Sequence, residues 1–82
     1  MDKKLLIDYP DGMKLYMDIG NCYLRLKQYD STIVYVKKAI RLFPNEVVLY
    51  ANLAYTYKQA GNMDSAKVYD AIVAKMDPNF NR

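Results

Sequence analysis

The side chains that carry most enzyme chemistry are nearly missing from this chain. Its 82 residues include no histidine and a single cysteine, Cys22. The usual zinc sites and the Cys–His or Ser–His pairs of nucleophilic catalysis are therefore excluded. Asp18 and Asp70 have no second carboxylate at a spacing that supports general acid–base chemistry. We predict no catalytic residue, no metal ligand and no cofactor, and we expect that the protein is not an enzyme.

The composition is that of one small folded domain. The chain is 52% hydrophobic and 26% charged, with only three glycines and three prolines, which argues against disorder. Its 12 basic and 9 acidic residues are interleaved, whereas a nucleic-acid footprint is normally a concentrated basic stripe. The apolar runs are far shorter than the roughly 18 residues that span a bilayer, and we expect no signal peptide. One unpaired cysteine is compatible with a reducing compartment such as the cytoplasm.

An internal repeat of 34 residues organises the chain. The three prolines, Pro10, Pro44 and Pro78, are separated by two intervals of this length. Agreement at many other positions with the same interval is improbable by chance, so the repeat indicates a repeat architecture. The recurring pairs are Lys3 and Lys37, Lys4 and Lys38, Leu6 and Ile40, Tyr9 and Phe43, Tyr16 and Tyr50, Tyr23 and Tyr57, Asp30 and Asp64, and Tyr35 and Tyr69.

Each repeat contains two stripes of apolar residues with helical spacing. Small residues at Gly20 and Ala54 are predicted to let the second helix of each hairpin approach the first closely. Cys22 lies beside the first stripe and is expected to be a buried, inert thiol. The stripes are Tyr16, Ile19, Gly20 and Tyr23, then Ile33, Val36, Ala39 and Ile40, in the first repeat, and Tyr50, Leu53, Ala54 and Tyr57, then Ala66, Tyr69, Val73 and Met76, in the second.

Polar and small residues mark the ends of these helices. Asp30 and Asp64 are suited to N-cap the second helix of each repeat, because a carboxylate accepts hydrogen bonds from first-turn N–H groups. Asn45 is predicted to cap the helix after Pro44, and Gly61 fits a helix C-terminus that needs positive φ. Asp11-Gly12 is predicted to break the chain between hairpins. The predicted helices span residues 3–8, 13–27, 30–42, 46–60 and 64–76.

This pattern resembles the tetratricopeptide repeat family, in which an aromatic residue, Leu-Gly and Tyr precede Ala, an apolar residue and a final Pro. The two copies begin with Tyr16-x-x-Ile19-Gly20-x-x-Tyr23 and Tyr50-x-x-Leu53-Ala54-x-x-Tyr57 and end at Pro44 and Pro78. The departures are Lys27 for a favoured Gly, Thr32 for Ala, and Asp70 for an apolar residue. The last predicts loose packing or water contact at the C-terminal edge. The resemblance implies an all-α fold of tetratricopeptide-like helical hairpin repeats stacked as a short right-handed α-solenoid.

The resemblance implies a single repeat domain over residues 1–82. Residues 3–10 match a partial repeat, residues 13–44 the first full hairpin and residues 46–78 the second. Because the matched chain begins inside a repeat, we expect it to be an excerpt of a longer protein. We also expect few side chains to cover the apolar faces at the two ends of the helix stack, so that copies of the chain self-associate through these ends. The residues expected at these ends are Leu5, Leu6 and Tyr9 at the first and Val73 and Met76 at the second.

In this family the stacked first helices line a concave groove that binds an extended or helical peptide. The resemblance therefore implies a protein–protein interaction scaffold with a peptide or protein partner. An alternative for Met17 and Leu24 is that they pack against neighbouring helices. The predicted groove residues are Lys14, Met17, Asp18, Asn21, Leu24 and Arg25 from the first helix and Val48, Ala51, Asn52, Tyr55 and Lys58 from the next.

Two asparagines of this set match a specific ligand site of the family. Chaperone-binding members clamp a C-terminal carboxylate between asparagines at the positions of Asn21 and Asn52, together with several cations. Met17 stands where a lysine is expected, and a third repeat that would supply further cations is missing. The sequence therefore disfavours this clamp.

Single-stranded nucleic-acid binding is the second function class. Pentatricopeptide repeats form a similar hairpin with a period of about 35 residues and read RNA one base per repeat. The 34-residue interval and the proline positions favour the tetratricopeptide pattern. Lys37, Lys38 and Arg41 form a basic turn on a second helix, which predicts a solvated convex face.

Overall fold

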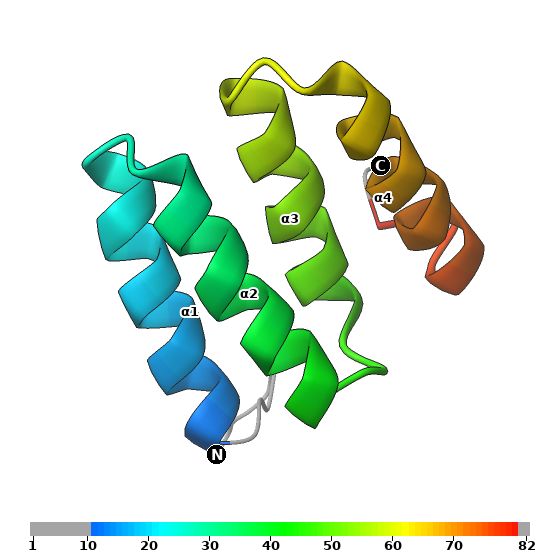
Figure 1. Cartoon of the computed structure of the whole chain (residues 1–82). Helices are drawn as coiled ribbons and strands as arrows, with labels where there is room; N and C mark the ends of the chain where they lie inside the picture. Colours follow the sequence, from blue (N-terminus) through cyan, green and yellow to red (C-terminus); the bar gives the residue numbers. More distant parts are fainter. Residues whose placement is uncertain (1–10, 81–82) are drawn as a thin grey trace.

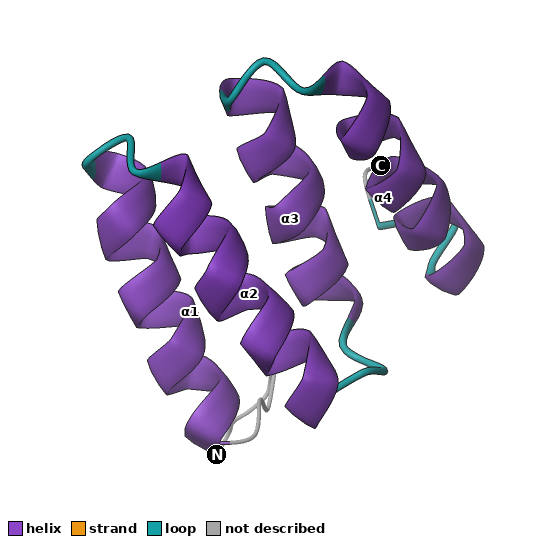
Figure 2. Ribbon diagram, in the orientation of Figure 1, coloured by secondary structure: helices purple, strands orange, loops and turns teal. Residues whose placement is uncertain are grey.

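The computed structural model describes residues 11–80, and these form four helices (Figure 1). They are α1 (Asp11–Arg25), α2 (Tyr29–Leu42), α3 (Val47–Gln59) and α4 (Met63–Met76). The rest of this range consists of the turns that join the helices and a turn that follows α4 (Figure 2). The predicted helix 3–8, and the expectation for Leu5, Leu6 and Tyr9, lie outside the described residues. The all-α fold and the four remaining helices are confirmed.

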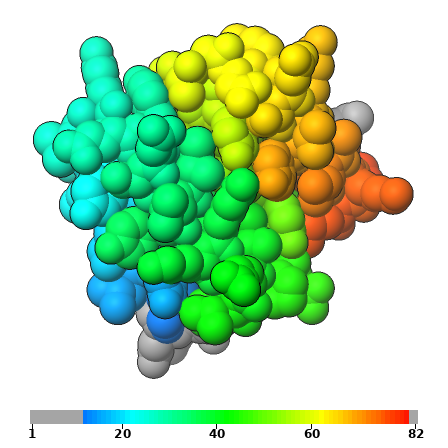
Figure 3. Space-filling model, in the orientation of Figure 1, coloured from blue at the N-terminus to red at the C-terminus, as the bar shows by residue number. Residues whose placement is uncertain are grey.

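The helices form two antiparallel hairpins, α1–α2 and α3–α4, that stack in chain order. The main contacts join α1 to α2, α2 to α3 and α3 to α4, so each helix packs on the next one in the sequence. The array measures 40 × 27 × 21 Å along its principal axes. In the space-filling view the colours follow one another across the molecule, and side chains fill the space between successive helices (Figure 3). This arrangement is a helical-hairpin solenoid.

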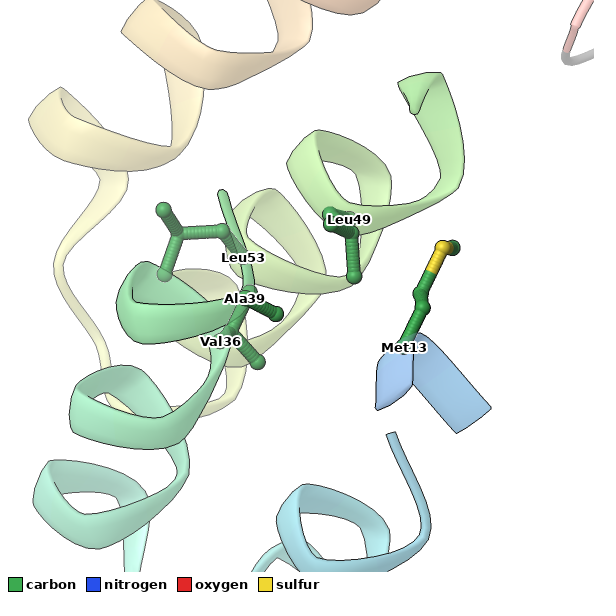
Figure 4. Packing of buried hydrophobic residues seen from close by; sticks show 5 residues of the cluster. All are labelled: Met13, Val36, Ala39, Leu49 and Leu53. Atoms are coloured by element: carbon green, nitrogen blue, oxygen red, sulfur yellow. The ribbon is translucent and has the colours of Figure 1, made fainter. Parts of the chain in front are cut away.

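A buried apolar cluster joins the first three helices (Figure 4). It consists of Met13 from α1, Val36 and Ala39 from α2, and Leu49 and Leu53 from α3. Removing these side chains from water is the dominant favourable term in folding. The cluster therefore joins the two hairpins into one packed unit.

Small residues allow close approach within each hairpin, as predicted. Gly20 and Ala54 are both buried, and a Cβ added at Gly20 would lie 3.6 Å from Cγ2 of Val36. The Thr32 hydroxyl lies 3.2 Å from the Gly20 carbonyl oxygen and 3.1 Å from that of Gln28, and donates its proton between them. The family's Ala is thus replaced by a residue that ties α2 to the backbone of α1.

Stacked tyrosines repeat the same contact in both hairpins. The rings of Tyr23 and Tyr35 lie 5.5 Å apart with an interplanar angle of 16°, and those of Tyr57 and Tyr69 lie 5.6 Å apart at 12°. Each pair joins the first helix of its hairpin to the second. Recurrence at the 34-residue interval therefore reflects a structural contact at these four positions.

The turns inside the hairpins are closed by residues with positive φ. Gly61 has φ 86°, which confirms its predicted place after a helix, and Lys27 at the equivalent position has φ 60°. The N–H of Gln28 donates to the Tyr23 carbonyl (2.9 Å), and the N–H of Asn62 donates to the Tyr57 carbonyl (2.8 Å). This six-to-one bond ends α1 at Arg25, two residues before the predicted end at Lys27.

The predicted N-caps are wrong. Asp30 and Asp64 lie in the first turns of α2 and α4, where their negative charges interact favourably with the positive end of the helix dipole. The N-cap positions are Gln28, which makes no side-chain cap bond, and Asn62, whose Oδ1 accepts from the Ser65 N–H at 3.2 Å. Both helices begin two residues after a positive-φ residue, so the turn sets the start.

Two further boundary predictions are also wrong. The N-cap of α3 is Glu46, without a side-chain cap bond, and Asn45 lies in the preceding turn. Asp11 and Gly12 belong to α1 and do not break the chain there. A Cβ at Gly12 would lie 3.4 Å from Cζ of Phe43, so the first turn of α1 packs closely against the end of α2.

Burial corrects two expectations and agrees with two others. Cys22 is exposed, because it lies on the face of α1 that points away from α2, whereas the equivalent Thr56 of α3 is fully buried. Val73, expected to be partly open, is buried in the α3–α4 hairpin, while Met76 is exposed. Asp70 is half-exposed at the edge of α4, in agreement with water contact there.

Candidate peptide-binding groove

The predicted groove residues lie on α1 and α3, the first helices of the two hairpins. The exposed members are Lys14, Asp18, Asn21, Arg25, Tyr55 and Lys58. The half-buried members are Met17, Leu24, Val48, Ala51 and Asn52. None of the eleven is fully buried, so each can contribute atoms to a surface.

One groove residue of α1 and one of α3 pack against the same buried cluster. Met17 and Val48 both pack against the buried cluster formed by Met13, Leu49 and their neighbours. The alternative interpretation of Met17, packing against neighbouring helices, therefore holds for part of its side chain. Met17 of α1 and Val48 of α3 thus each contribute part of their side chain to the core that joins the two hairpins.

The asparagines supply hydrogen-bonding groups on these helices. Neither Asn21 nor Asn52 makes a side-chain hydrogen bond to another residue in the range 11–80. The backbone carbonyl of Asn52 accepts from the Thr56 hydroxyl at 2.8 Å, which ties the buried Thr56 to its own helix. A side-chain amide carries two donors and an acceptor, so it can pair with the backbone of an extended peptide.

Lys58 at the C-terminal end of α3 has a partner on the neighbouring helix. Its Nζ lies 3.1 Å from Oδ2 of Asp70, with the two side chains 48% and 41% exposed. This ion pair explains how α4 tolerates a carboxylate where the repeat favours an apolar residue. An ion pair this exposed contributes at most about 1 kcal/mol. Lys14 and Arg25 are the other cations of the groove set, and Asp18 is its single acid.

The carboxylate-clamp arrangement is incomplete in this geometry. Met17 stands where the clamp has a lysine, and its side chain packs against the core cluster. Asn21 therefore lacks the cation one turn before it that would help neutralise a terminal carboxylate.

Two family models described as tetratricopeptide repeat match the chain, over residues 14–46 and residues 35–68. The chain belongs to the tetratricopeptide repeat family. Repeats of this family generally mediate protein–protein interactions and are typically scaffolds without catalytic activity. The expected protein partner follows at this coarse level.

Two relatives contain segments that are similar to this chain in sequence. The chain is 33% identical over 63 residues to the uncharacterized protein ycf37 of Guillardia theta, covering 77% of the chain and 35% of that protein. It is 28% identical over 72 residues to a protein O-mannosyl-transferase of Caenorhabditis elegans, covering 88% of the chain and 10% of that protein. The tetratricopeptide chain thus spans about a third and a tenth of these relatives.

The part of the tetratricopeptide chain that the structure describes offers no group of three His, Cys, Asp or Glu side chains that could hold a metal ion. Among the same residues no helix is both long and apolar enough to cross a membrane.

Sequence reasoning missed two surface features of the tetratricopeptide array. A shallow surface hollow of about 240 Å³ is lined by Tyr16, Lys38, Arg41 and Leu42, and another of about 490 Å³ lies beside the α1–α2 turn and Ala60. Neither contains a predicted groove residue. The second feature is apolar exposure on α1, where Leu15 is 60% and Leu26 66% exposed. The signal in the sequence was that Leu15 is the repeat equivalent of Leu49, which marks this side of α1 as an apolar face.

Proposed function

We propose that the chain is a non-catalytic scaffold that binds a peptide or a partner segment along the surface formed by the eleven predicted groove residues of α1 and α3. The observation that carries this proposal is the shared packing of Met17 and Val48 on one core cluster. Because Met17 of α1 and Val48 of α3 pack on the same cluster, this packing supports a groove surface that continues from the first hairpin to the second. A partner lying along it would touch both repeats at once.

The chemistry of the surface suits an adaptable contact. Met17, Leu24 and Tyr55 provide flexible and aromatic apolar groups, and such residues are enriched at protein interfaces. Asn21 and Asn52 are available to hydrogen-bond a peptide backbone, which would fix the direction of the segment without demanding one sequence.

The charges favour a partner segment with acidic side chains. Lys14 and Arg25 are exposed on α1, where Asp18 is the single acid of the groove set, and Lys58 is already paired with Asp70. Charge complementarity of this kind mainly raises the association rate and excludes basic partners.

The test begins with peptides selected from a random-sequence display library against the whole chain. We expect Asn52→Ala to weaken a selected peptide by about 1 kcal/mol or more in calorimetry, because it removes a hydrogen-bonding partner at the centre of the surface. Asn45→Ala is the matched control, since Asn45 is an exposed asparagine in the α2–α3 turn. Circular dichroism should show that both variants remain folded.

Two results would contradict this proposal. Chemical-shift changes confined to Lys37, Lys38 and Arg41 on peptide addition would move the site to the basic turn of α2. Binding to single-stranded RNA that weakens by orders of magnitude between low and moderate salt would instead favour the nucleic-acid alternative.

Self-association through the ends of the array is a separate proposal. The exposed Leu15 and Leu26 support it, because large apolar side chains grouped on one face commonly mark an interaction surface. It does not depend on peptide binding.

A further inference from the structure

The two repeats treat equivalent faces of their first helices differently. The 34-residue repeat pairs Leu15 with Leu49 and Cys22 with Thr56. Leu49 and Thr56 are fully buried in α3, which packs against α2, whereas Leu15 is 60% exposed and Cys22 is exposed in α1. Among residues 11–80, no helix covers the face of α1 that is equivalent to the buried face of α3.

This face of α1 is a continuous stripe. Leu15, Ile19, Cys22 and Leu26 follow one another at spacings of four, three and four residues, which places them on one side of a helix. Ile19 is half-buried and Leu26, directly after the last helical residue, is 66% exposed. We call these four residues the outer stripe.

The far end of the array does not match the outer stripe. In α2, Val36 belongs to the buried cluster and Ile33, Ile40 and Phe43 pack against it. The corresponding residues of the second repeat are Lys67, Asp70, Ala74 and Asp77. A second copy therefore cannot place α4 on the outer stripe as α2 sits on α3. Head-to-tail stacking, which would produce open chains, lacks its apolar contact.

The outer stripe is complementary to itself. The pairs Leu15–Leu26 and Ile19–Cys22 share one midpoint, between Gly20 and Asn21. An antiparallel copy of α1 on a twofold axis at this midpoint sets Leu15 opposite the second copy's Leu26 and Ile19 opposite its Cys22. We propose that two copies of the chain associate in this way, through their outer stripes.

The charges beside the stripe select the antiparallel direction. Asp18 and Arg25 are exposed and lie two turns apart along the same flank of α1. In the antiparallel pair each Asp18 falls within about 3 Å, along the helix axis, of the position level with the second copy's Arg25. In a parallel twofold pair the two copies of this flank would lie on opposite sides of the interface, so Asp18 and Arg25 of different copies could not pair.

The dimer is expected to be weak. The stripe from Leu15 to Leu26 is about 16 Å long, and one helix pair of this length buries less than the roughly 1,200 Å² of a stable interface. This inference rests on the proposed self-association and specifies its surface and symmetry. Because Asp18 and Arg25 also belong to the groove set, dimer formation would narrow access to the α1 side of the groove.

Sedimentation of the full chain from about 10 µM to 1 mM, a range suited to a weak complex, tests the proposal. We expect Leu15→Glu and Leu26→Lys each to weaken the dimer at least tenfold, because each sets a charge against an apolar side chain of the second copy. The double variant should regain most of the association, since the new carboxylate lies opposite the new ammonium group. Val34→Glu is the control, because Val34 is 50% exposed on α2, away from the stripe, and should not change association.

Cys22 gives an independent readout because it is the only cysteine and lies close to the proposed axis. Helices packed about 8–10 Å apart bring the two thiols within reach of a short bismaleimide. A covalent dimer should form with the natural chain and the double variant, and fall at least tenfold with either single variant.

Each other outcome overturns the inference in a distinct way. If the chain stays monomeric up to 1 mM, both the outer-stripe dimer and the proposed self-association are wrong. Peptide binding in the groove would be unaffected by this result, because it is measured separately with the selected peptides. A dimer that neither single variant weakens keeps self-association but removes the outer stripe from it. A monomeric chain whose melting temperature drops in both single variants would assign the stripe to a segment of the same chain.

Discussion

Lys27 adopts a backbone conformation that usually belongs to glycine. Its φ is 60°, and the equivalent Gly61 has φ 86°. A side chain in this region is strained by about 1–2 kcal/mol, part of which is offset because glycine loses more freedom on folding. We expect Lys27→Gly to raise the free energy of unfolding by about 0.5–1 kcal/mol in urea titrations.

Two variants separate the backbone effect from the loss of charge. Lys27→Ala removes the ammonium group without relieving φ, and so should not be stabilising. Gly61→Lys should destabilise by about 1 kcal/mol, because no atom lies within 4 Å of a Cβ at Gly61 and only the backbone strain remains. Stabilisation by Lys27→Ala equal to that by Lys27→Gly would show that φ is not the cause.

The sequence predicts the role of a single residue well where the backbone conformation requires one residue type. It predicts the N-cap residue poorly where several neighbouring polar residues could cap the same helix. Gly61 was identified because positive φ favours glycine. Asp30, Asp64 and Asn45 were all assigned as caps and are not. Side-chain chemistry alone does not determine which residue is the N-cap. The preceding turn sets where the helix starts, and so which residue lies next to its unpaired first-turn N–H groups.

At the scale of helices, the fit of α3 against α4 depends on a small residue. Ala54 is buried on α3, and Gly20, its equivalent in the first hairpin, faces Val36 of the paired helix. Ala54→Leu should lower the free energy of unfolding by about 1–3 kcal/mol, because added methyl groups force α4 away. Thermal and urea unfolding measure this effect.

The matched control for Ala54→Leu is Ala74→Leu on the exposed side of α4. That exchange should change stability by no more than about 0.5 kcal/mol. Equal effects of the two substitutions would mean that Ala54 is not enclosed between the helices.

Helices were the most predictable level of this molecule. Four predicted segments correspond to α1–α4 with ends that differ by at most two residues, because the apolar period and the 34-residue repeat act over whole helices. The groove set was predicted from the family resemblance together with this period, and the structure leaves all its members at least partly accessible. The apolar period alone could not predict that Met17 and Val48 also pack against the buried core, because that contact depends on how the two hairpins stack.

At the scale of the whole molecule, equivalent residues differ because their surroundings differ. Cys22 was expected to be buried from its place beside the stripe, and its equivalent Thr56 is indeed buried. The difference arises because α3 has α2 on that face, whereas the same face of α1 is exposed. A sequence pattern describes one repeat, and it does not state which neighbours each copy has.

Polarity on α4 should therefore control the size of assemblies. Lys67, Asp70, Ala74 and Asp77 stand where α2 has Ile33, Val36, Ile40 and Phe43. Giving α4 the four α2 residues should create a face that fits the outer stripe of another copy. Loss of the Lys58–Asp70 ion pair matters little for folding because both side chains are nearly half exposed to water.

We expect this fourfold variant to form open head-to-tail chains, seen in sedimentation as species that grow beyond dimers with concentration, because each copy then has two complementary ends. Adding Leu15→Glu to the same variant should stop this growth, since it places a carboxylate in the contact that repeats along the chain. Growth that persists with Leu15→Glu would mean that the new apolar face associates with itself. A variant that remains at the size of the natural chain would show that polarity at α4 is not what limits stacking.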